Sequence, residues 1–307
     1  MSLPSVCVVI PAYNSEMTLH RALDSVAMQT LPPSEILVVD DASSDATRSM
    51  AQSYDRAKVD VVGTGVNLGA SGARNEGIRA ASADLIAFLD ADDEWLPTKL
   101  EKQVQLIADN QNSTFCSCGS SLISPEGINL GDIYRGQTVT TGPEAWKALL
   151  KDNYVTTPSV LVWRRHLLAL GGFDESLKIA EDQDMWIRLA ERGGLSYVSE
   201  TLVLVHGRRS SLSGGSSVDD QMTYTLPMIE RHLERLSDRL TREDCRSIMG
   251  RRILRAGQLA FSRGARDVGR KLIWRSITLG YKPWEGLVFL MKANSVAMRL
   301  KQAIRES

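Results

Sequence analysis

The fold class is clearest at residues 85–94, which read Leu85-Ile86-Ala87-Phe88-Leu89-Asp90-Ala91-Asp92-Asp93-Glu94. The first five residues form a short continuous apolar run, which is typical of a strand buried on both faces of a parallel sheet. Four acidic residues follow within five positions, at the carboxyl end of that strand. Clustered carboxylates raise one another's pKa unless a cation lies among them, and Mg²⁺ and Mn²⁺ prefer oxygen ligands. Two interpretations stay open here: a metal site, or an acidic cap on the helix expected at 97–107.

Strand and helix patterns alternate along the first two thirds of the chain. Apolar strands are predicted at 6–10, 36–39, 59–62, 85–89, 115–123, 159–163 and 196–205. Helical periodicity is found between them at 19–27, 45–54, about 67–81, 97–107, 143–150, 164–170 and 182–192. This alternation predicts βαβ units and an α/β fold, in which a mostly parallel sheet is flanked by helices in three layers.

The charge distribution divides the 307-residue chain into two parts. Residues 220–307 hold 18 Lys and Arg against 9 Asp and Glu, whereas residues 1–219 hold 18 against 28. We therefore expect a main domain at 1–219 and a basic helical region at 220–307. The basic excess indicates an anionic surface, lipid or partner. The alternative is that these arginines pair with acidic residues of the same region.

The sequence carries no signal for export or for crossing a membrane. It has neither a charged N-terminal segment followed by a long apolar stretch nor an apolar run of about 18 residues. The four cysteines, Cys7, Cys116, Cys118 and Cys245, form no CxxC metal pattern. We expect a reduced, cytoplasmic compartment and no nucleic-acid partner.

Polar residues follow three of the predicted parallel strands, at Pro11–Tyr13, Asp40-Asp41 and Asp90–Asp93. Ligands of open α/β sheets bind at this edge, so these segments predict one site. No glycine-rich turn follows the first strand and no P-loop is present, which disfavours a dehydrogenase. Tyr13 is suited to stacking on a nucleobase, unless it only covers the rim of the core. Asp41 can accept a hydrogen bond from a base imide, and Asp40 either assists or holds its own loop.

Five motifs in this order resemble the family 2 glycosyltransferases over roughly residues 4–210. They are Val8-Val9-Ile10-Pro11-Ala12-Tyr13-Asn14, Val38-Val39-Asp40-Asp41-Ala42-Ser43-Ser44-Asp45, Asn67-Leu68-Gly69 with Gly72-Ala73-Arg74-Asn75, Phe88-Leu89-Asp90-Ala91-Asp92-Asp93 (the DXD type), and Glu181-Asp182. The resemblance implies a GT-A fold, with a nucleotide-binding half at about 1–110 and an acceptor-binding half at about 111–219. It also implies a nucleotide-sugar donor, most often uridine-linked, and Mn²⁺ or Mg²⁺.

The resemblance also assigns roles to residues. Tyr13 and Asp41 would hold the donor base, with Asp40 nearby, and Pro11 and Ala12 would also contact the donor nucleotide. Arg74 would face the sugar or diphosphate, unless it is a helix-surface arginine bound to a carboxylate, and Asp90 would bind ribose. Asp92 would bind the metal, with Asp93 as the alternative ligand and His206 as a further contact. Arg208 or Arg209 could clamp the leaving group.

The acid pair Glu181-Asp182 would complete the reaction. Direct displacement at the anomeric carbon needs a carboxylate that accepts the proton of the acceptor hydroxyl. Asp182 is the expected base, Glu181 would orient it or bind acceptor hydroxyls, and Asp184 is the spare candidate. The product would have inverted anomeric configuration. The alternative is that these acids only complement the amino end of a helix.

The expected acceptor is a glycan or a lipid-linked glycan. Residues 280–307 would then contact the inner face of the cell membrane through Trp284 and its apolar neighbours, or pack on the main domain or a second subunit as a homodimer. Two other functions stay open: an inactive nucleotide- or glycan-binding protein of the same fold, and a sugar nucleotidyltransferase.

Overall fold

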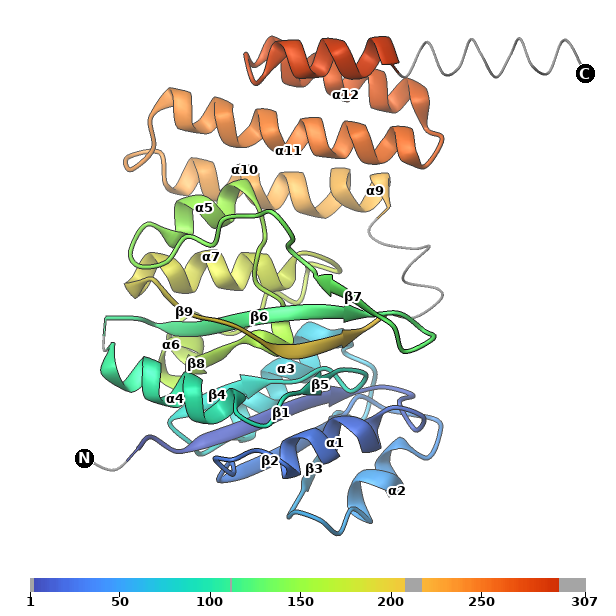
Figure 1. Cartoon of the computed structure of the whole chain (residues 1–307), viewed down its shortest axis with the longest axis vertical. Coiled ribbons are helices and arrows are strands. Elements are labelled where there is room, and N and C mark those ends of the chain that lie inside the picture. Colours follow the sequence, from blue (N-terminus) through green and yellow to red (C-terminus); the bar gives the residue numbers. More distant parts are fainter. Residues whose placement is uncertain (1–2, 111, 208–216, 293–307) are drawn as a thin grey trace, which may run out of the picture. The chain divides into compact units, whose positions relative to one another are not determined.

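The computed structural model describes residues 3–110, 112–207 and 217–292 (Figure 1). The chain divides into two compact units. The first comprises Met1–Leu149 and Asn153–Gly215, and the second comprises Leu150–Asp152 and Ser216–Ser307. The assignment of nucleotide-binding and acceptor-binding halves within the first unit stays a prediction.

The N-terminal part of the first unit is a parallel sheet in the order β3-β2-β1-β4. Its strands are β1 (Val6–Ala12), β2 (Glu35–Asp40), β3 (Asp60–Gly63) and β4 (Leu85–Phe88). β1 pairs with both β2 and β4, so Val8 lies opposite Ile36 on one side and Ala87 on the other. Residues 6–10 are almost fully buried, as expected for a continuous apolar run. The carboxyl ends of β1, β2 and β4 therefore meet at one edge.

The remainder of the sheet makes it mixed, and the order continues through β8-β6-β9-β5. These strands are β5 (Glu94–Trp95), β6 (Phe115–Ile123), β7 (Asn129–Asp132), β8 (Leu161–Trp163) and β9 (Leu195–His206). β8 runs antiparallel to β4 and β6, whereas β6 and β9 are parallel. The α/β fold class is confirmed. The short strands β5 and β7 were not predicted, because two and four residues carry no apolar pattern of their own.

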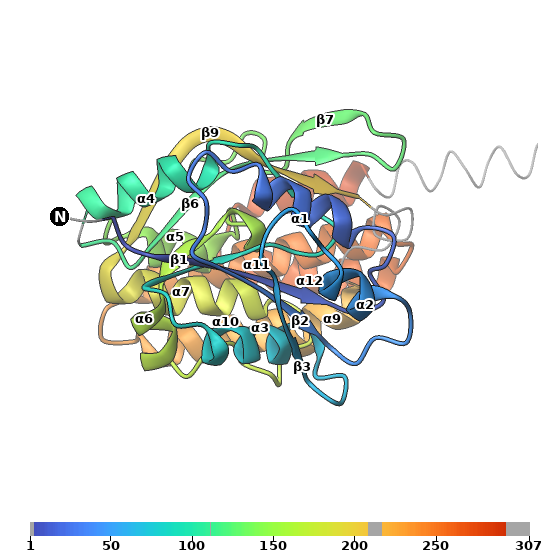
Figure 2. The same cartoon turned by 90° about the horizontal axis from the view of Figure 1, so that it is seen from below.

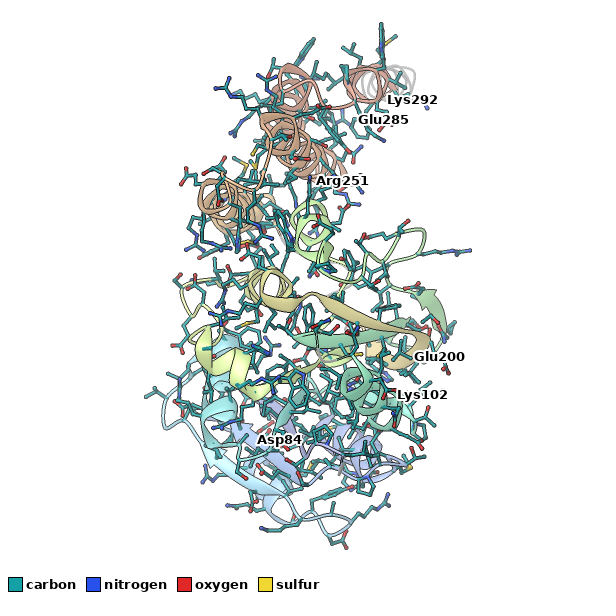
Figure 3. The ribbon with its side chains drawn as sticks, turned by 90° about the vertical axis from the view of Figure 1, so that its left-hand side faces the viewer. Asp84, Lys102, Glu200, Arg251, Glu285 and Lys292 are labelled. Carbon is teal, nitrogen blue, oxygen red and sulfur yellow. The ribbon has the colours of Figure 1, made fainter. Side chains whose placement is uncertain are left out.

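Helices cover both faces of the sheet (Figure 2). On one face, α1 (Leu19–Ala27), α2 (Thr47–Gln52) and α4 (Lys99–Asp109) share one apolar core with the strands. Lys102 of α4 also donates to Glu200 of β9, 2.5 Å away (Figure 3). The other face carries α3 (Gly69–Ala80), α6 (Arg164–Ala169) and α7 (Glu181–Gly193), with Trp186 stacked on Phe115. The first unit also contains α5 (Ala145–Lys151) and the 3₁₀ turn η1 (Thr157–Ser159).

The second unit is helical, as the sequence predicts. It contains α9 (Val218–Asp220), a π-helical turn η2 (Gln221–Thr225), α10 (Leu226–Arg235), α11 (Arg242–Ser262), α12 (Arg266–Thr278) and a helical stretch at 283–292. Leu254, Ile273 and Leu290 form its core. Arg251 of α11 forms an ion pair with Asp152 at 2.5 Å. Within the described ranges, no helix has the length and apolar character needed to span a bilayer.

Gly77 determines how closely α3 approaches the sheet. A Cβ atom at this position would lie 2.3 Å from Cγ1 of Val9 in β1 and 3.3 Å from Val39 in β2. Both valines are fully buried, and a β-branched side chain in a strand has little rotamer freedom to move aside. The glycine therefore allows α3, which carries Arg74, to lie against β1 and β2.

We expect Gly77→Ala to lower the free energy of unfolding by about 1–3 kcal/mol through overpacking, even though alanine is the better helix former by about 1 kcal/mol. Denaturant unfolding followed by circular dichroism measures this change. Arg79→Ala, on the exposed side of the same helix, is the control and should change stability by no more than about 0.5 kcal/mol. A Gly77→Ala protein as stable as the native one would contradict this account of α3.

Candidate active site

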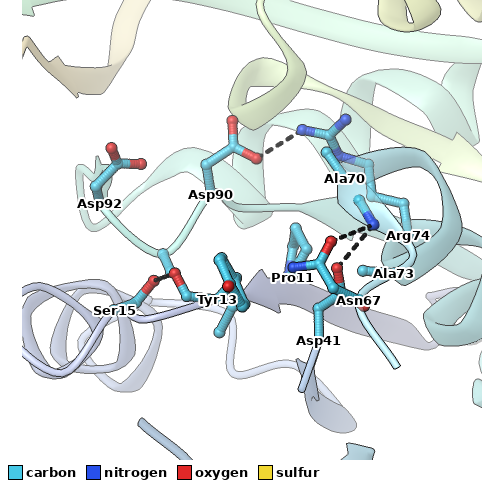
Figure 4. A pocket seen from close by; sticks show the side chains of 13 residues that line it. Pro11, Tyr13, Ser15, Asp41, Asn67, Ala70, Ala73, Arg74, Asp90 and Asp92 are labelled. Atoms are coloured by element: carbon cyan, nitrogen blue, oxygen red, sulfur yellow. Dashed lines mark hydrogen bonds and ion pairs between the residues drawn. The ribbon is translucent and has the colours of Figure 1, made fainter. Parts of the chain in front are cut away.

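A pocket of about 380 Å³ lies at the shared edge of β1, β2 and β4 (Figure 4). Four segments supply its walls: the ends of these three strands and the start of α3. The lining residues are Pro11, Ala12, Tyr13, Ser15, Asp41, Asn67, Gly69, Ala70, Ala73, Arg74, Asp90, Ala91 and Asp92. The structure thus gathers every predicted donor-binding residue except Asp40, together with Asp92 from the predicted metal ligands.

Tyr13 and Asp41 form one side of the pocket. Tyr13 is 51% exposed, so its ring is available to a ligand. Asp41 is buried, and its carboxylate accepts from the backbone N–H groups of Leu68 and Gly69, each at 2.8 Å, and from the Thr64 hydroxyl at 2.9 Å. Asp41 therefore holds the loop that leads into α3.

Asp40 does not line the pocket. Its carboxylate accepts from the backbone N–H of Ser43 at 3.2 Å and from Nη1 of Arg48 at 3.5 Å. These contacts match the structural alternative for Asp40, in which it holds its own loop.

Arg74 connects the pocket to the acid pair. Its buried guanidinium donates to Asp90 at 2.8 Å (Figure 4). The same guanidinium donates to Glu181 at 3.0 Å. Burial lowers the pKa of Arg74, but the carboxylates of Asp90 and Glu181 outweigh that effect and raise it above its usual range. Arg74 is therefore a permanent cation between the segments of Asp90 and Glu181, and Glu181 lies 107 residues from Arg74 in the sequence.

Asp182 differs from its acidic neighbours in what surrounds it. The described contacts of its carboxylate are with neutral donors: Nδ2 of Asn153 at 3.1 Å and the backbone N–H of Gln183 at 2.6 Å. Burial and the charge of Glu181 raise the pKa of Asp182 to about 6. A carboxylate with that pKa is ionised at neutral pH and can still take up a proton, as a general base must.

Asp184, the spare candidate for the base, forms an ion pair with Arg188. The guanidinium lies 2.6 Å from the Asp184 carboxylate, and both side chains are largely buried. Arg188 also donates to the carbonyl oxygens of Leu170 and Gly172. Asp184 therefore holds Arg188, and Arg188 joins α7 to the turn after α6.

A second pocket, of about 310 Å³, lies on the other side of Asp92. It is lined by Thr18, Arg21, Asp92, Ser124, Pro125, Gly127, His206 and Gly207. Arg21 donates to the backbone carbonyl of Asp92, so α1 holds this segment. Asp92 is the residue that both pockets share.

Asp93 and His206 are held in place by β9. Asp93 is buried and accepts from the backbone N–H of His206 at 3.0 Å. Burial, Asp90 and Asp92 raise the pKa of Asp93 well above its usual range. The His206 ring lies 3.2 Å from Glu94 of β5, and burial and Arg21 lower its pKa. Arg208 and Arg209 lie outside the described residues.

No three His, Cys, Asp or Glu side chains are arranged to hold a metal ion in the part of the chain that the structure describes. A divalent cation here would therefore need ligands beyond the side chains. Mg²⁺ is commonly bound in this way, through one or two carboxylates completed by substrate phosphates and water. Asp92, at the junction of the two pockets, provides a carboxylate of that kind.

Backbone strain is concentrated next to the site residues. Asn14, Ala42 and Ala180 adopt positive φ angles of 47°, 60° and 63°, which non-glycine residues rarely do. They directly adjoin Tyr13, Asp41 and Glu181 in the sequence. Strained residues of this kind tend to cluster at functional sites, where they fix the direction of a neighbouring side chain.

The structure adds residues that the sequence did not single out. Asn67 lines the pocket, and Asn153 contacts Asp182. Asn75, within the quoted Gly-Ala-Arg-Asn motif, exchanges hydrogen bonds with the backbone of Phe173 and so fixes the loop before α7. The Gly-Ala-Arg-Asn motif could have identified Asn75. Asn153 lies 29 residues before Asp182 and belongs to no sequence motif that would have identified it.

Comparison with known proteins gives the family. Residues 7–142 match the family described as Glycosyl transferase family 2. The chain is 28% identical over 236 residues to TuaG of Bacillus subtilis, a glycosyltransferase named for teichuronic acid biosynthesis, covering 76% of this chain and 90% of that one. It is 30% identical over 194 residues to the Escherichia coli UDP-Glc:alpha-D-GlcNAc-diphosphoundecaprenol beta-1,3-glucosyltransferase WfgD, covering 63% and 73% of the two chains.

The fold matches that of TarS from S. aureus. Residues 1–349 of that protein, in complex with UDP-GlcNAc, superpose with a TM-score of 0.58 at 19% identity, covering 90% of this chain and 92% of that one. At this identity the likeness supports the GT-A type of fold alone. The family match and the relative at 30% identity confirm the predicted class of enzyme: the chain belongs to glycosyl transferase family 2.

Proposed function

We propose that this glycosyltransferase inverts the anomeric centre as it moves a sugar from a UDP-sugar to a glycan or lipid-linked glycan. The observation that carries the proposal is the bridge of Arg74 between Asp90 in the pocket and Glu181 beside Asp182. A donor in the pocket would thereby lie one side chain away from a carboxylate able to act as base.

The names of relatives support the donor and acceptor classes. WfgD is named for UDP-glucose and a diphosphoundecaprenol acceptor. A Campylobacter jejuni relative, 26% identical over 254 residues, is named as a glucosyltransferase acting on a PP-undecaprenol glycan. A UDP-sugar donor and a lipid-linked acceptor are therefore the first candidates for this chain.

The pocket suits a nucleotide. The exposed ring of Tyr13 offers a stacking surface for a base, and Pro11 and Ala12 supply the adjoining wall. A carboxylate has about four acceptor positions, and Asp41 already uses three for its loop. The remaining position can accept the imide N–H of uracil, while Asp90 would face the ribose and Arg74 the diphosphate or sugar.

A divalent ion would be bound by Asp92 together with the donor diphosphate, with Asp93 and His206 next to it. Burial and the carboxylates of Asp90 and Asp92 raise the pKa of Asp93, and such clustered carboxylates favour a cation near them. Such an ion would stabilise negative charge on the departing diphosphate. The protein's own contribution is to hold Asp92 in place through Arg21 and β9.

Asp182 would accept the proton of the acceptor hydroxyl while its oxygen attacks the anomeric carbon and the bond to the diphosphate breaks. Attack on the face opposite the leaving group inverts the configuration. Glu181, paired with Arg74, would orient the donor and acceptor. A nucleotidyltransferase would release pyrophosphate rather than UDP, and membership of family 2 disfavours it.

Binding of the donor should depend on manganese through Asp92. A ligand at a hundredfold its Kd stabilises a protein by about 2.7 kcal/mol. Thermal-shift measurements with UDP, UDP-glucose and UDP-GlcNAc, with and without Mn²⁺, should show stabilisation that Mn²⁺ increases. Asp92→Ala should remove the manganese-dependent part. Asp55→Ala, an exposed carboxylate outside the pockets, is the control, and an equal loss in both variants would contradict the assignment.

Asp182→Asn should keep UDP-sugar binding and lower transfer by about 10²- to 10⁴-fold, because the amide cannot accept the proton. Release of UDP in the presence of a lipid-linked acceptor measures the reaction, and the thermal shift measures binding. Glu181→Gln should weaken binding as well, because it removes a partner of Arg74. Full turnover by Asp182→Asn would refute the assignment of the base.

We also propose that the helical stretch at 283–292 contacts the membrane at its cytoplasmic face. Trp284, Val288 and Met291 are 78%, 46% and 70% exposed, and their i, i+4, i+7 spacing places them on one side of the helix. Leu290 packs into the core on the other side. A basic region with an outward apolar stripe is suited to an anionic bilayer surface.

Co-sedimentation with vesicles that contain phosphatidylglycerol should therefore fall when Trp284 and Met291 are both changed to Ser. Met28→Ser, at a residue of the first unit that is 59% exposed, is the control and should bind as the native protein does. If the double variant instead dissociates a dimer and keeps its affinity for vesicles, the stripe is a subunit interface.

A further inference from the structure

We propose that Asn153 is a positioning residue for Asp182, which its side-chain amide holds in one orientation and keeps ionised for proton transfer. This inference rests on the proposed role of Asp182 as the base. It adds a residue from the loop after α5, which ends at Lys151, a segment that none of the five sequence motifs includes.

The amide of Asn153 is fixed at both ends. Its Nδ2 donates to Oδ2 of Asp182 at 3.1 Å, and its Oδ1 accepts from the backbone N–H of Val155 at 3.2 Å. Because the backbone N–H can only donate, Oδ1 must face Val155 and the NH₂ group must face Asp182. The local turn therefore presets the donor before any substrate binds.

A second contact ties the same segment to α7. The side chain of Gln183 donates to the carbonyl oxygen of Leu149 at 2.6 Å, while its backbone N–H donates to Oδ1 of Asp182 at 2.6 Å. Both carboxylate oxygens of Asp182 are thus held, one from its own helix and one from Asn153. Each of these oxygens keeps a further lone pair with which it would accept from an acceptor hydroxyl.

The charged and titratable groups around Asp182 make this neutral donor important. Glu181 and burial favour the protonated form of Asp182, and Arg74 favours the ionised form. Arg74 is shared with Asp90 and Glu181, and the phenol of Tyr134 lies close enough for Asp182 to raise its pKa. A hydrogen bond to the ionised form lowers a carboxyl pKa, and Asn153 supplies one.

The test follows the ionisation of Asp182 directly. In protein labelled with ¹³C at the aspartate carboxyl carbons, the NMR signal that Asp182→Asn removes reports this residue. We expect it to titrate near 6 in the native chain and at higher pH in Asn153→Ala. It should titrate higher still in Asn153→Asp, where a carboxylate would face Asp182. Gln183→Ala keeps both donors to Asp182, so it should lower stability without moving this titration.

Turnover of UDP-glucose or UDP-GlcNAc near pH 6 should be highest in the native chain, lower in Asn153→Ala and lowest in Asn153→Asp. If the pKa of Asp182 rises from about 6 to about 7, Asn153→Ala loses about fivefold at pH 6 through ionisation alone and little at pH 8. An Asp182 signal that titrates alike in the native and Asn153→Ala proteins overturns the inference. Full turnover by Asp182→Asn would instead refute the proposed base, and with it any role for Asn153 in catalysis.

Discussion

The buried guanidinium of Arg74 is the interaction on which the arrangement of the site depends. A buried charge costs several kcal/mol unless it is paired, and here Asp90 and Glu181 provide the pairing. The bridge brings the end of β4 and the start of α7 together. It is available only because Gly77 lets α3 lie against β1 and β2. The close packing that Gly77 allows therefore places the Arg74 guanidinium, one helical turn away, between Asp90 and Glu181.

The residues with positive φ angles also help to position the site residues. Asn14, Ala42 and Ala180 each turn the chain immediately beside a residue of the site, where a relaxed backbone would point the side chain elsewhere. Hydrogen bonds compensate for part of this cost: the Asn14 side chain accepts from Ser44, and its backbone N–H donates to Ser43. The loops at the sheet edge thus hold one another, and the edge presents a preformed surface rather than flexible ends.

The sequence predicted the elements that carry a pattern of their own. β1 and β4 are continuous apolar runs, and α1 has apolar residues at helical spacing, so both kinds of element follow from local sequence. The direction of β8 did not follow, because three apolar residues read the same in a parallel or an antiparallel strand. The pocket residues were found through their positions after strands. Their hydrogen-bond partners were not found in this way. The three bonds to Asp41 come from residues 23–28 positions away, and Asn153 reaches Asp182 from the loop after α5.

Glu181, Asp182 and Asp184 lie in the first turn of α7. Their hydrogen-bond and ion-pair partners differ. All three complement the amino end of the helix, which is why the sequence left a purely structural interpretation open. Glu181 and Asp184 are each paired with an arginine, Arg74 and Arg188. The described contacts of Asp182 are neutral donors. Those donors hold its orientation, and burial and the charge of Glu181 raise its pKa to about 6. The interpretation of these acids as helix caps alone does not account for this difference in partners.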